Sequence, residues 1–210
     1  FFVFQTATLR LSSRAAETSR LSVQNLSIRE HYEGFPNNIL QCYLVRDKNG
    51  VDNHHPLIPN KEGLVGDLVV VAIGLSLFIG GDKHLMPSIA ALTPESAVSC
   101  YYSTTLNAIW KRYPPSPDAP ARKGTSHFGK HTAQYQLDGC KLHIAAQLFG
   151  GWNIGEGARS DYFSNPFPYL LDGAKALACW PKIDGEYQAV RVASYDAISK
   201  DIGDKICSAF

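Results

Sequence analysis

Three histidines and two lysines are the side chains of this chain whose types and spacing could do chemistry together. His127, His131 and His143 lie close in sequence, with Lys130 and Lys141 among them. Two imidazoles beside an ammonium group suit acid–base cleavage of RNA, because one ring takes the 2′-hydroxyl proton while the other protonates the leaving group. No carboxylate is spaced to orient these rings. The alternative is that they are surface histidines on a loop and on a solvent-facing strand.

Other reactive side chains give no support for catalysis. His54 and His55 are adjacent in an expected extended loop, where neighbouring side chains point apart and cannot share a metal ion. Ser99 and Ser103 lack the Gly-x-Ser-x-Gly elbow of a hydrolase. The Gly-rich stretch 150–157 lacks the Lys-Ser/Thr ending of a nucleotide-binding loop. We therefore expect no cofactor, no metal and a function that does not depend on catalysis.

Aromatic and basic side chains on two loops are candidates for a binding surface. The aromatic residues are Trp152, Tyr162 and Phe163, and the basic ones are Arg122 and Lys123 in a Pro-rich loop. Aromatic residues on a loop form either a recognition surface or a small satellite core. Separated basic residues either dock on an anionic surface or are simply solvated. We predict that these five residues contact a partner.

The first part of the chain predicts a short lead-in followed by a small sheet. Residues 1–20 show weak periodicity, whereas 21–29 and 39–45 have the composition and alternation of strands. The polar segment 52–62 contains two prolines and is the expected boundary. The predicted organisation is an arm or lead-in at 1–20, a β-rich extension at 21–62 and the main domain at 63–210.

The main domain has the pattern of a split βαβ fold. Residues 64–79 are rich in β-branched residues and predict a buried strand. Thr93 and Pro94 start a helix with one apolar stripe, and Asp138-Gly139 is a hairpin turn between two alternating segments. A helix at 168–179, a strand at 186–194 and a last helix capped by Asp196 complete the expected order. We predict an α+β fold of the ferredoxin-like kind, an antiparallel sheet with helices on one face, preceded by the β extension.

Composition excludes several classes of protein. Hydrophobic residues make up 45% of the 210 residues and charged residues 19%, which excludes wholesale disorder. The formal net charge of +1 lacks the surplus that drives binding to a phosphate backbone, so we expect no nucleic-acid partner. The longest uncharged apolar run, 68–81, is shorter than the roughly 18 residues of a membrane helix, so we expect no membrane span.

The five cysteines bear on the compartment. Their spacing excludes a zinc ribbon and a CxxC redox pair. Two alternatives remain: two disulfides with one odd thiol in an extracellular protein, or five reduced thiols, which are often buried. The Asn25-Leu26-Ser27 sequon, with Asn25 as a glycosylation site, favours the extracellular alternative.

The placement of the cysteines in residues 64–210 resembles that of small secreted fungal killer toxins and related necrosis-inducing effectors. The residues that carry the likeness are Ala97-Val98-Ser99-Cys100, Leu137-Asp138-Gly139-Cys140-Lys141-Leu142, Cys179 and Lys205-Ile206-Cys207. The resemblance implies two bridges among Cys100, Cys140, Cys179 and Cys207. Their pairing stays open, as does the role of Cys42.

The predicted function is that of a secreted, disulfide-stabilised, non-enzymatic effector. Such a protein would act as a monomer or weak oligomer that binds a host or target-cell component. One alternative is a viral coat subunit, because residues 41–47 have the look of a jelly-roll strand and its turn. The other is a small secreted ribonuclease that uses His127, His131 and His143.

Overall fold

Helices and a small antiparallel sheet share the chain, so the fold is α+β, as predicted. The computed structural model describes residues 1–29, 39–46, 53–61, 67–69, 72, 74, 83–114, 123–152 and 166–187. The named elements are α1 (Phe2–Arg10), α2 (Ala15–Ser19), the 3-10 turn η1 (Val23–Asn25), β1 (Leu26–Arg29), β2 (Ile39–Leu44), β3 (Asn53–Pro56), α4 (Pro87–Ala90), α5 (Glu95–Arg112), α6 (Phe128–Gly139), α7 (His143–Gly150), α9 (Phe167–Leu177), β4 (Lys182–Ile183) and β5 (Glu186–Tyr187).

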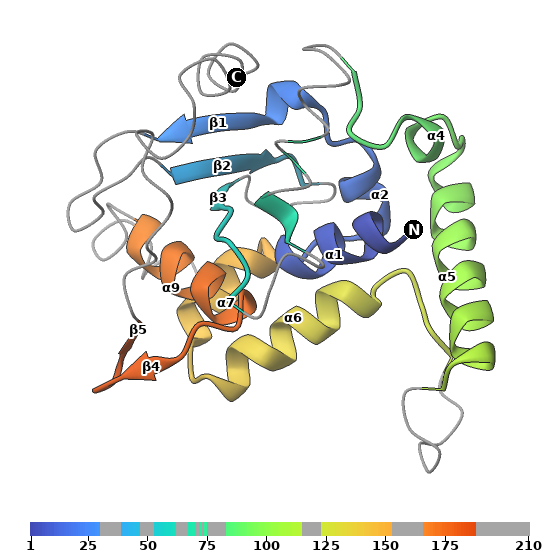
Figure 1. Ribbon diagram of the computed structural model, residues 1–210. Helices are drawn as coiled ribbons and strands as arrows, with labels where there is room; N and C mark the ends of the chain where they lie inside the picture. The colour runs from blue at the N-terminus through green and yellow to red at the C-terminus, as the bar shows by residue number, and fades with distance from the viewer. Residues whose placement is uncertain are drawn as a thin grey trace.

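The sheet of β1, β2 and β3 is antiparallel, with β2 in the centre (Figure 1). Cys42 of β2 is opposite Leu26 of β1 and His55 of β3. The strands predicted at 21–29 and 39–45 are thus confirmed as β1 and β2, although the first begins five residues late, after η1. The third strand lies inside the segment 52–62 expected as a boundary, and the division of the chain at residue 63 stays a prediction.

Helix α1 is central to the packing. It lies between the sheet and α6 in Figure 1, and it contributes Ala7 and Leu11 to the cluster beneath the sheet. Phe4, from another face of α1, joins Tyr102 of α5 in a second cluster. A third cluster is built mainly by α6, α7 and α9. Residues 1–20, expected as an arm or lead-in, therefore form part of the core.

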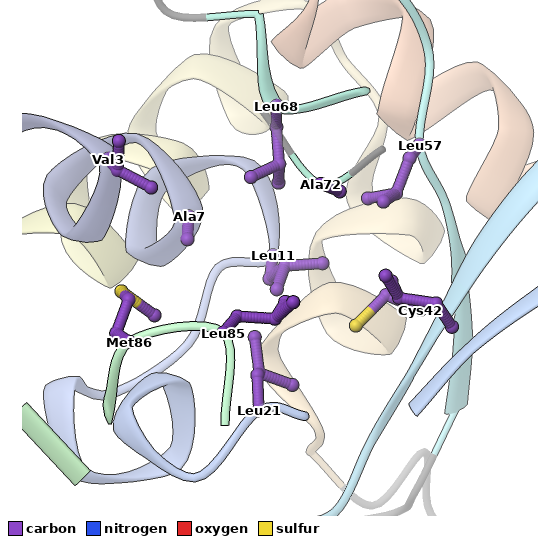
Figure 2. Close-up of a pocket in the computed structure, with 11 residues that line it drawn as sticks. Val3, Ala7, Leu11, Leu21, Cys42, Leu57, Leu68, Ala72, Leu85 and Met86 are labelled. Atoms are coloured by element: carbon purple, nitrogen blue, oxygen red, sulfur yellow. The ribbon is translucent and has the colours of Figure 1, made fainter. Parts of the chain in front are cut away.

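A small apolar cavity of about 20 Å³ lies between α1 and the sheet (Figure 2). Its walls include Val3 and Ala7 from α1, Leu11 just after this helix, and Cys42 from β2. The volume is close to what one water molecule needs, but a water also needs polar partners, which these side chains do not supply. The cavity is a packing defect rather than a ligand site.

Helix α5 confirms the helix predicted from Thr93 and Pro94. Val98, Tyr102 and Leu106 of its apolar stripe are buried, as the spacing requires. The stripe loses its cover in the last turn, where Ile109 is 39% exposed and Tyr113 beyond it is 64% exposed. The helix predicted at 168–179 is likewise confirmed as α9.

The hairpin predicted around Asp138-Gly139 is wrong, because both of its strands are helices, α6 and α7. Ala133 and Leu137 alternate with polar residues, but they are also four residues apart, which places them on one helix face. Both are fully buried, whereas Tyr135, which an alternating strand would place with them, is 84% exposed. The period of 3.6 therefore determines this segment, and the ferredoxin-like order that depended on the hairpin is not confirmed.

The buried strand predicted at 64–79 is also wrong where the structure describes it. Leu68, Val69, Ala72 and Gly74 are helical, and Leu68 and Ala72 are buried one turn apart. At the other end, Glu186–Tyr187 pairs with β4, while the rest of the strand expected at 186–194 and the helix expected after Asp196 lie outside the described residues.

The disulfides implied by the toxin resemblance are absent among the described cysteines. Cys100, Cys140 and Cys179 are free thiols, as is the buried Cys42, and Cys207 lies outside the described residues. Cys100 is exposed on α5 and Cys179 is exposed after α9, and neither is bonded to another described cysteine. Within the described part, no helix is both long and apolar enough to cross a membrane.

Candidate functional site

A buried ion pair forms the base of the candidate site. Glu17 is on α2 and Arg46 follows β2, and Arg46 Nη1 is 3.1 Å from Glu17 Oε2. Each side chain is only 1% exposed. Removing two charges from water is costly unless further hydrogen bonds compensate. Arg46 makes such bonds by donating to the carbonyl oxygens of Leu11, Ser12 and Phe149.

Arg14 lies on the solvent side of this pair. Its backbone N–H donates to Glu17 Oε2 at 2.8 Å, which closes the start of α2, and its Nη1 lies 3.3 Å from Glu17 Oε1. The Arg14 side chain is 34% exposed, in contrast to its partner. Glu17 therefore holds one guanidinium in the interior and a second at the surface.

The start of α6 brings two imidazoles to the same place. His127 and His131 are one turn apart, and their ring centroids are separated by 6.1 Å. Partial burial lowers the pKa of His127, and the neighbouring charges of Arg14, His131 and Lys130 lower it further, against the opposing effect of Glu17. This imidazole is therefore neutral at neutral pH. The N-terminus of α6 adds the positive end of a helix dipole.

Lys130, on the inner side of the same turn, is the third cation of the site. Its Nζ donates to the carbonyl of Gly150 at 2.7 Å and lies 5.5 Å from the ring centroid of Trp152. Burial lowers the pKa of Lys130 to about 8, with a further contribution from Arg46. Trp152 is 51% exposed at the rim of the site.

His55 supports Arg46 from the sheet. Its Nε2 lies 3.4 Å from Arg46 Nη2, and its ring packs on Phe149 with centroids 4.7 Å apart. Burial lowers the pKa of His55 well below its usual value, and the charge of Arg46 acts in the same direction. His55 is thus a neutral spacer beside the ion pair.

The described site contains three cations, Arg14, Arg46 and Lys130, and one carboxylate, Glu17. Arg14 lies at the partly exposed rim, with Arg46 and Lys130 buried behind it. This surplus of positive charge suits an anion, and arginine in particular recognises phosphate. A neutral imidazole at the same rim can exchange a proton with a bound group. No group of three or more His, Cys, Asp or Glu side chains among the described residues is placed to hold a metal ion.

The structure brings together only part of the predicted histidine site. His127 and His131 start α6, whereas His143 lies beyond the other end of this helix, roughly 18 Å away along its axis. His143 Nδ1 is instead 3.4 Å from Asp138 Oδ1, so a carboxylate does contact one of the rings, contrary to the sequence interpretation. These three rings cannot converge on one substrate.

The other predicted residues lie apart or outside the described part. Trp152 belongs to the site, and Lys123 is exposed before α6. Arg122, Tyr162 and Phe163 lie outside the described residues. Asn25 Oδ1 accepts a hydrogen bond from the backbone N–H of Ser22, and its glycosylation stays a prediction.

Sequence reasoning missed Arg14, Glu17 and Arg46. Glu17 accepts a hydrogen bond from the Arg14 backbone N–H, as the acidic residue of a capping box does. Arginine has no acceptor atom, so the pair lacks the Ser/Thr signature that would mark the start of α2 in the sequence. Arg46 carried no signal, because a single arginine after a strand is ordinary and its burial depends on contacts from three distant segments.

Three solved structures share the arrangement of the chain. They are a Flpe–Holliday junction complex (TM-score 0.58, 16% identity), FLP recombinase–Holliday junction complex I (0.57, 17%) and a Flpe mutant–DNA Holliday junction complex (0.56, 16%). Each match covers 99% of this chain. Over its length, the chain shares the fold of these structures. It spans 57–58% of the length of those structures. No family model and no curated protein matches the sequence.

The fold shared with these complexes corrects the predicted class. The resemblance to secreted toxin-like effectors is wrong, and neither the coat subunit nor the ribonuclease fits. The expectation of no nucleic-acid partner is contradicted as well, because the neighbours are complexes with DNA junctions. The net charge of the whole chain does not show that Arg14, Arg46 and Lys130 lie close together.

Proposed function

We propose that this chain binds DNA and takes part in the exchange of DNA strands. The observation that carries the proposal is the cationic site built on the Glu17–Arg46 pair, which occurs in a recombinase-like fold. A phosphodiester is the anion in DNA that such a site would bind. The buried pair fixes the backbone around this site.

Three residues of the site have different roles in this proposal. Arg14 and the N-terminus of α6 bind the phosphate and stabilise the charge that grows on its oxygens as a strand is broken. His127 is neutral and exchanges a proton with the attacking or leaving oxygen. Arg46 does not face the substrate, and it acts as a positioning residue through Glu17.

Strand exchange also needs a nucleophile that forms a covalent bond to the phosphate, so that the energy of the broken phosphodiester is conserved for rejoining. A tyrosine hydroxyl can do this. The phenol loses its proton as its oxygen bonds to phosphorus, and the deoxyribose oxygen takes up a proton as it leaves. Tyr135 is exposed on α6, but it lies about 12 Å along the helix from His127. Tyr162 follows Trp152 by about ten residues, a length of chain that spans up to about 33 Å. We propose a tyrosine as the nucleophile, and the experiment compares Tyr135 with Tyr162.

The test uses a fluorescent four-way DNA junction and a duplex of the same sequence. We expect the chain to bind the junction in fluorescence anisotropy, and we expect Arg14→Ala to weaken binding by tenfold or more. Lys111→Ala, on the exposed last turn of α5, is the matched control and should leave binding unchanged. Absence of binding to either DNA at low salt would refute the proposal.

The chemical step is tested separately on a nicked substrate that traps a covalent intermediate. A protein–DNA adduct that survives denaturing electrophoresis is expected in the wild type. Its loss in Tyr162→Phe but not in Tyr135→Phe would identify Tyr162 as the nucleophile. An adduct that disappears in Tyr135→Phe would assign the nucleophile to α6. Junction binding without any adduct would restrict the function to DNA binding.

A further inference from the structure

The turn after α7 is clamped from two sides. The carbonyl of Phe149 accepts a hydrogen bond from Arg46, and the next carbonyl, that of Gly150, accepts one from Lys130 Nζ at 2.7 Å. Two consecutive carbonyls are thus held by two different cations. Gly151 follows with a φ of 66°, a left-handed conformation that favours glycine.

Trp152 lies directly against this turn. A Cβ atom at Gly150 would be 2.9 Å from the Trp152 ring, so only glycine lets the ring approach so closely. On the other side, a Cβ at Gly151 would be 3.0 Å from Arg46 Nε. The Lys130 ammonium is 5.5 Å from the Trp152 ring centroid, within the range of a cation–π interaction.

We infer that Lys130 is a positioning residue: its hydrogen bond holds the Gly150–Trp152 turn, and its charge draws the Trp152 ring to the edge of the anion site. The inference concerns the regulation of the site described above and rests on the proposed DNA-binding function for its consequence. The Lys130 ammonium extends from α6 to the Gly150 carbonyl, and the Trp152 ring lies beside it at the rim.

The surroundings of Lys130 make its charge sensitive to pH. Arg46 from the end of β2 and Arg14 from the start of α2 oppose the charge, and Glu17 supports it. On its own helix, His127 is the facing titratable group, and its lowered pKa keeps it neutral near pH 8. His55 of β3, behind Arg46, is also neutral. Arginine does not lose its proton in this range, so Lys130 is the cation of the described cluster that can switch off.

The attraction between Lys130 and the Trp152 ring therefore weakens in mildly alkaline solution. With its pKa lowered to about 8, Lys130 is charged in most molecules at pH 7. By pH 9 roughly one molecule in ten keeps the charge. A neutral amine still donates a hydrogen bond, but it loses the attraction to the Trp152 ring and to a phosphate at the rim.

The test follows Trp152 in the free protein by fluorine NMR after incorporation of 5-fluorotryptophan. The chain has three tryptophans, and Trp152→Phe identifies the relevant resonance by its loss. We expect that resonance to shift with a midpoint near pH 8, while those of Trp110 and Trp180 stay flat through the same range. Lys130→Arg keeps the charge and should abolish the pH-dependent shift, as should Lys130→Met, in which no charge is present.

Lys175→Met is the matched control, because Lys175 is also a buried lysine with a lowered pKa but lies on α9. It should leave the titration of Trp152 unchanged. A Trp152 resonance that does not titrate in the wild type, or that titrates equally in Lys130→Arg, would overturn the inference. Lys130→Arg remains decisive if Lys130→Met fails to fold.

Binding of the four-way junction is then measured at pH 7 and pH 9. The wild type should weaken by about tenfold relative to Lys130→Arg over this range. Titration of Trp152 in a protein that binds no DNA would support the positioning role while refuting the proposed function. Junction binding with a Trp152 resonance that does not respond to Lys130 would refute the positioning role alone.

Discussion

Arg46 Nη1 lies 3.1 Å from Glu17 Oε2, and neither side chain is more than 1% exposed. The pair joins the segment after β2 to α2, which are distant in sequence. Arg14 shares the same carboxylate from the surface side. The geometry of the exposed rim thus depends on charges that a ligand never touches.

Breaking the pair from one side should be costly. Arg46→Met leaves the Glu17 carboxylate buried without its main partner, and we expect the free energy of unfolding to fall by about 3–5 kcal/mol. Glu17→Gln combined with Arg46→Met should cost less than the sum of the two single changes, because it leaves no isolated charge. Urea unfolding followed by circular dichroism measures all three variants, and strictly additive losses would contradict the coupling.

Arg14 should set part of the salt dependence of DNA binding. Each protein–phosphate contact contributes about 0.9 to the slope of log Kd against log salt concentration. We therefore expect Arg14→Ala to reduce that slope by about one contact, and Lys111→Ala to leave it unchanged. Anisotropy titrations over a series of salt concentrations give the slopes, and an equal reduction in both variants would argue against a specific role for Arg14.

The pKa of His127 should rise when Arg14 is removed. Burial is the main cause of its lowered pKa, and the charge of Arg14 is the next. Because a nearby cation disfavours the imidazolium, Arg14→Ala should move the pKa upward, toward the usual value near 6.5. Proton NMR titration of the imidazole Cε1–H resonances reports the change. An unchanged or lower pKa would mean that the two side chains are not coupled.

Lys130 should make the protein less stable at neutral pH than above pH 8. Its folded pKa is depressed from 10.5 to about 8, so the unfolded chain binds more protons between these values. Stability must therefore rise with pH through this window, by up to about 3 kcal/mol. Lys130→Arg, which does not titrate there, should lack this increment when the two proteins are compared by chemical unfolding at pH 7 and pH 10.

Filling the cavity beneath the sheet should stabilise the fold. Val3 is one of its walls, and Val3→Ile adds one methylene, worth about 0.8 kcal/mol when buried. Val45 is 50% exposed, so Val45→Ile is a matched change that should have almost no effect. A fall in melting temperature for Val3→Ile would show that the space in Figure 2 cannot accept the added group.

The elements that sequence could predict are those in which several local signals agree. Helix α5 has a defined start, a regular apolar stripe and a terminating proline, and it occurs where expected. Residues 133–148 carry a pattern compatible with periods of both 2 and 3.6, and local signals cannot decide between these. Only the packing of Ala133 and Leu137 against α7 and α9 settles that segment as helix.

The site was predictable to a smaller extent. His127 and His131 attract attention because few side chains titrate near neutrality. The buried members, Glu17 and Arg46, are assembled by the tertiary fold from segments with unremarkable local sequence. The contribution of Glu17 and Arg46 to the site cannot be predicted before α1, β2 and α7 are brought together by the fold.

Arg46 also contributes to the capping of two helices, α1 and α7. It donates to the carbonyl of Leu11, just past α1, and to that of Phe149, in the last turn of α7. A helix leaves its final carbonyls without intrahelical partners and carries partial negative charge there. One guanidinium thus caps two helix C-termini at once, and the ends of α1 and α7 share a single cationic partner.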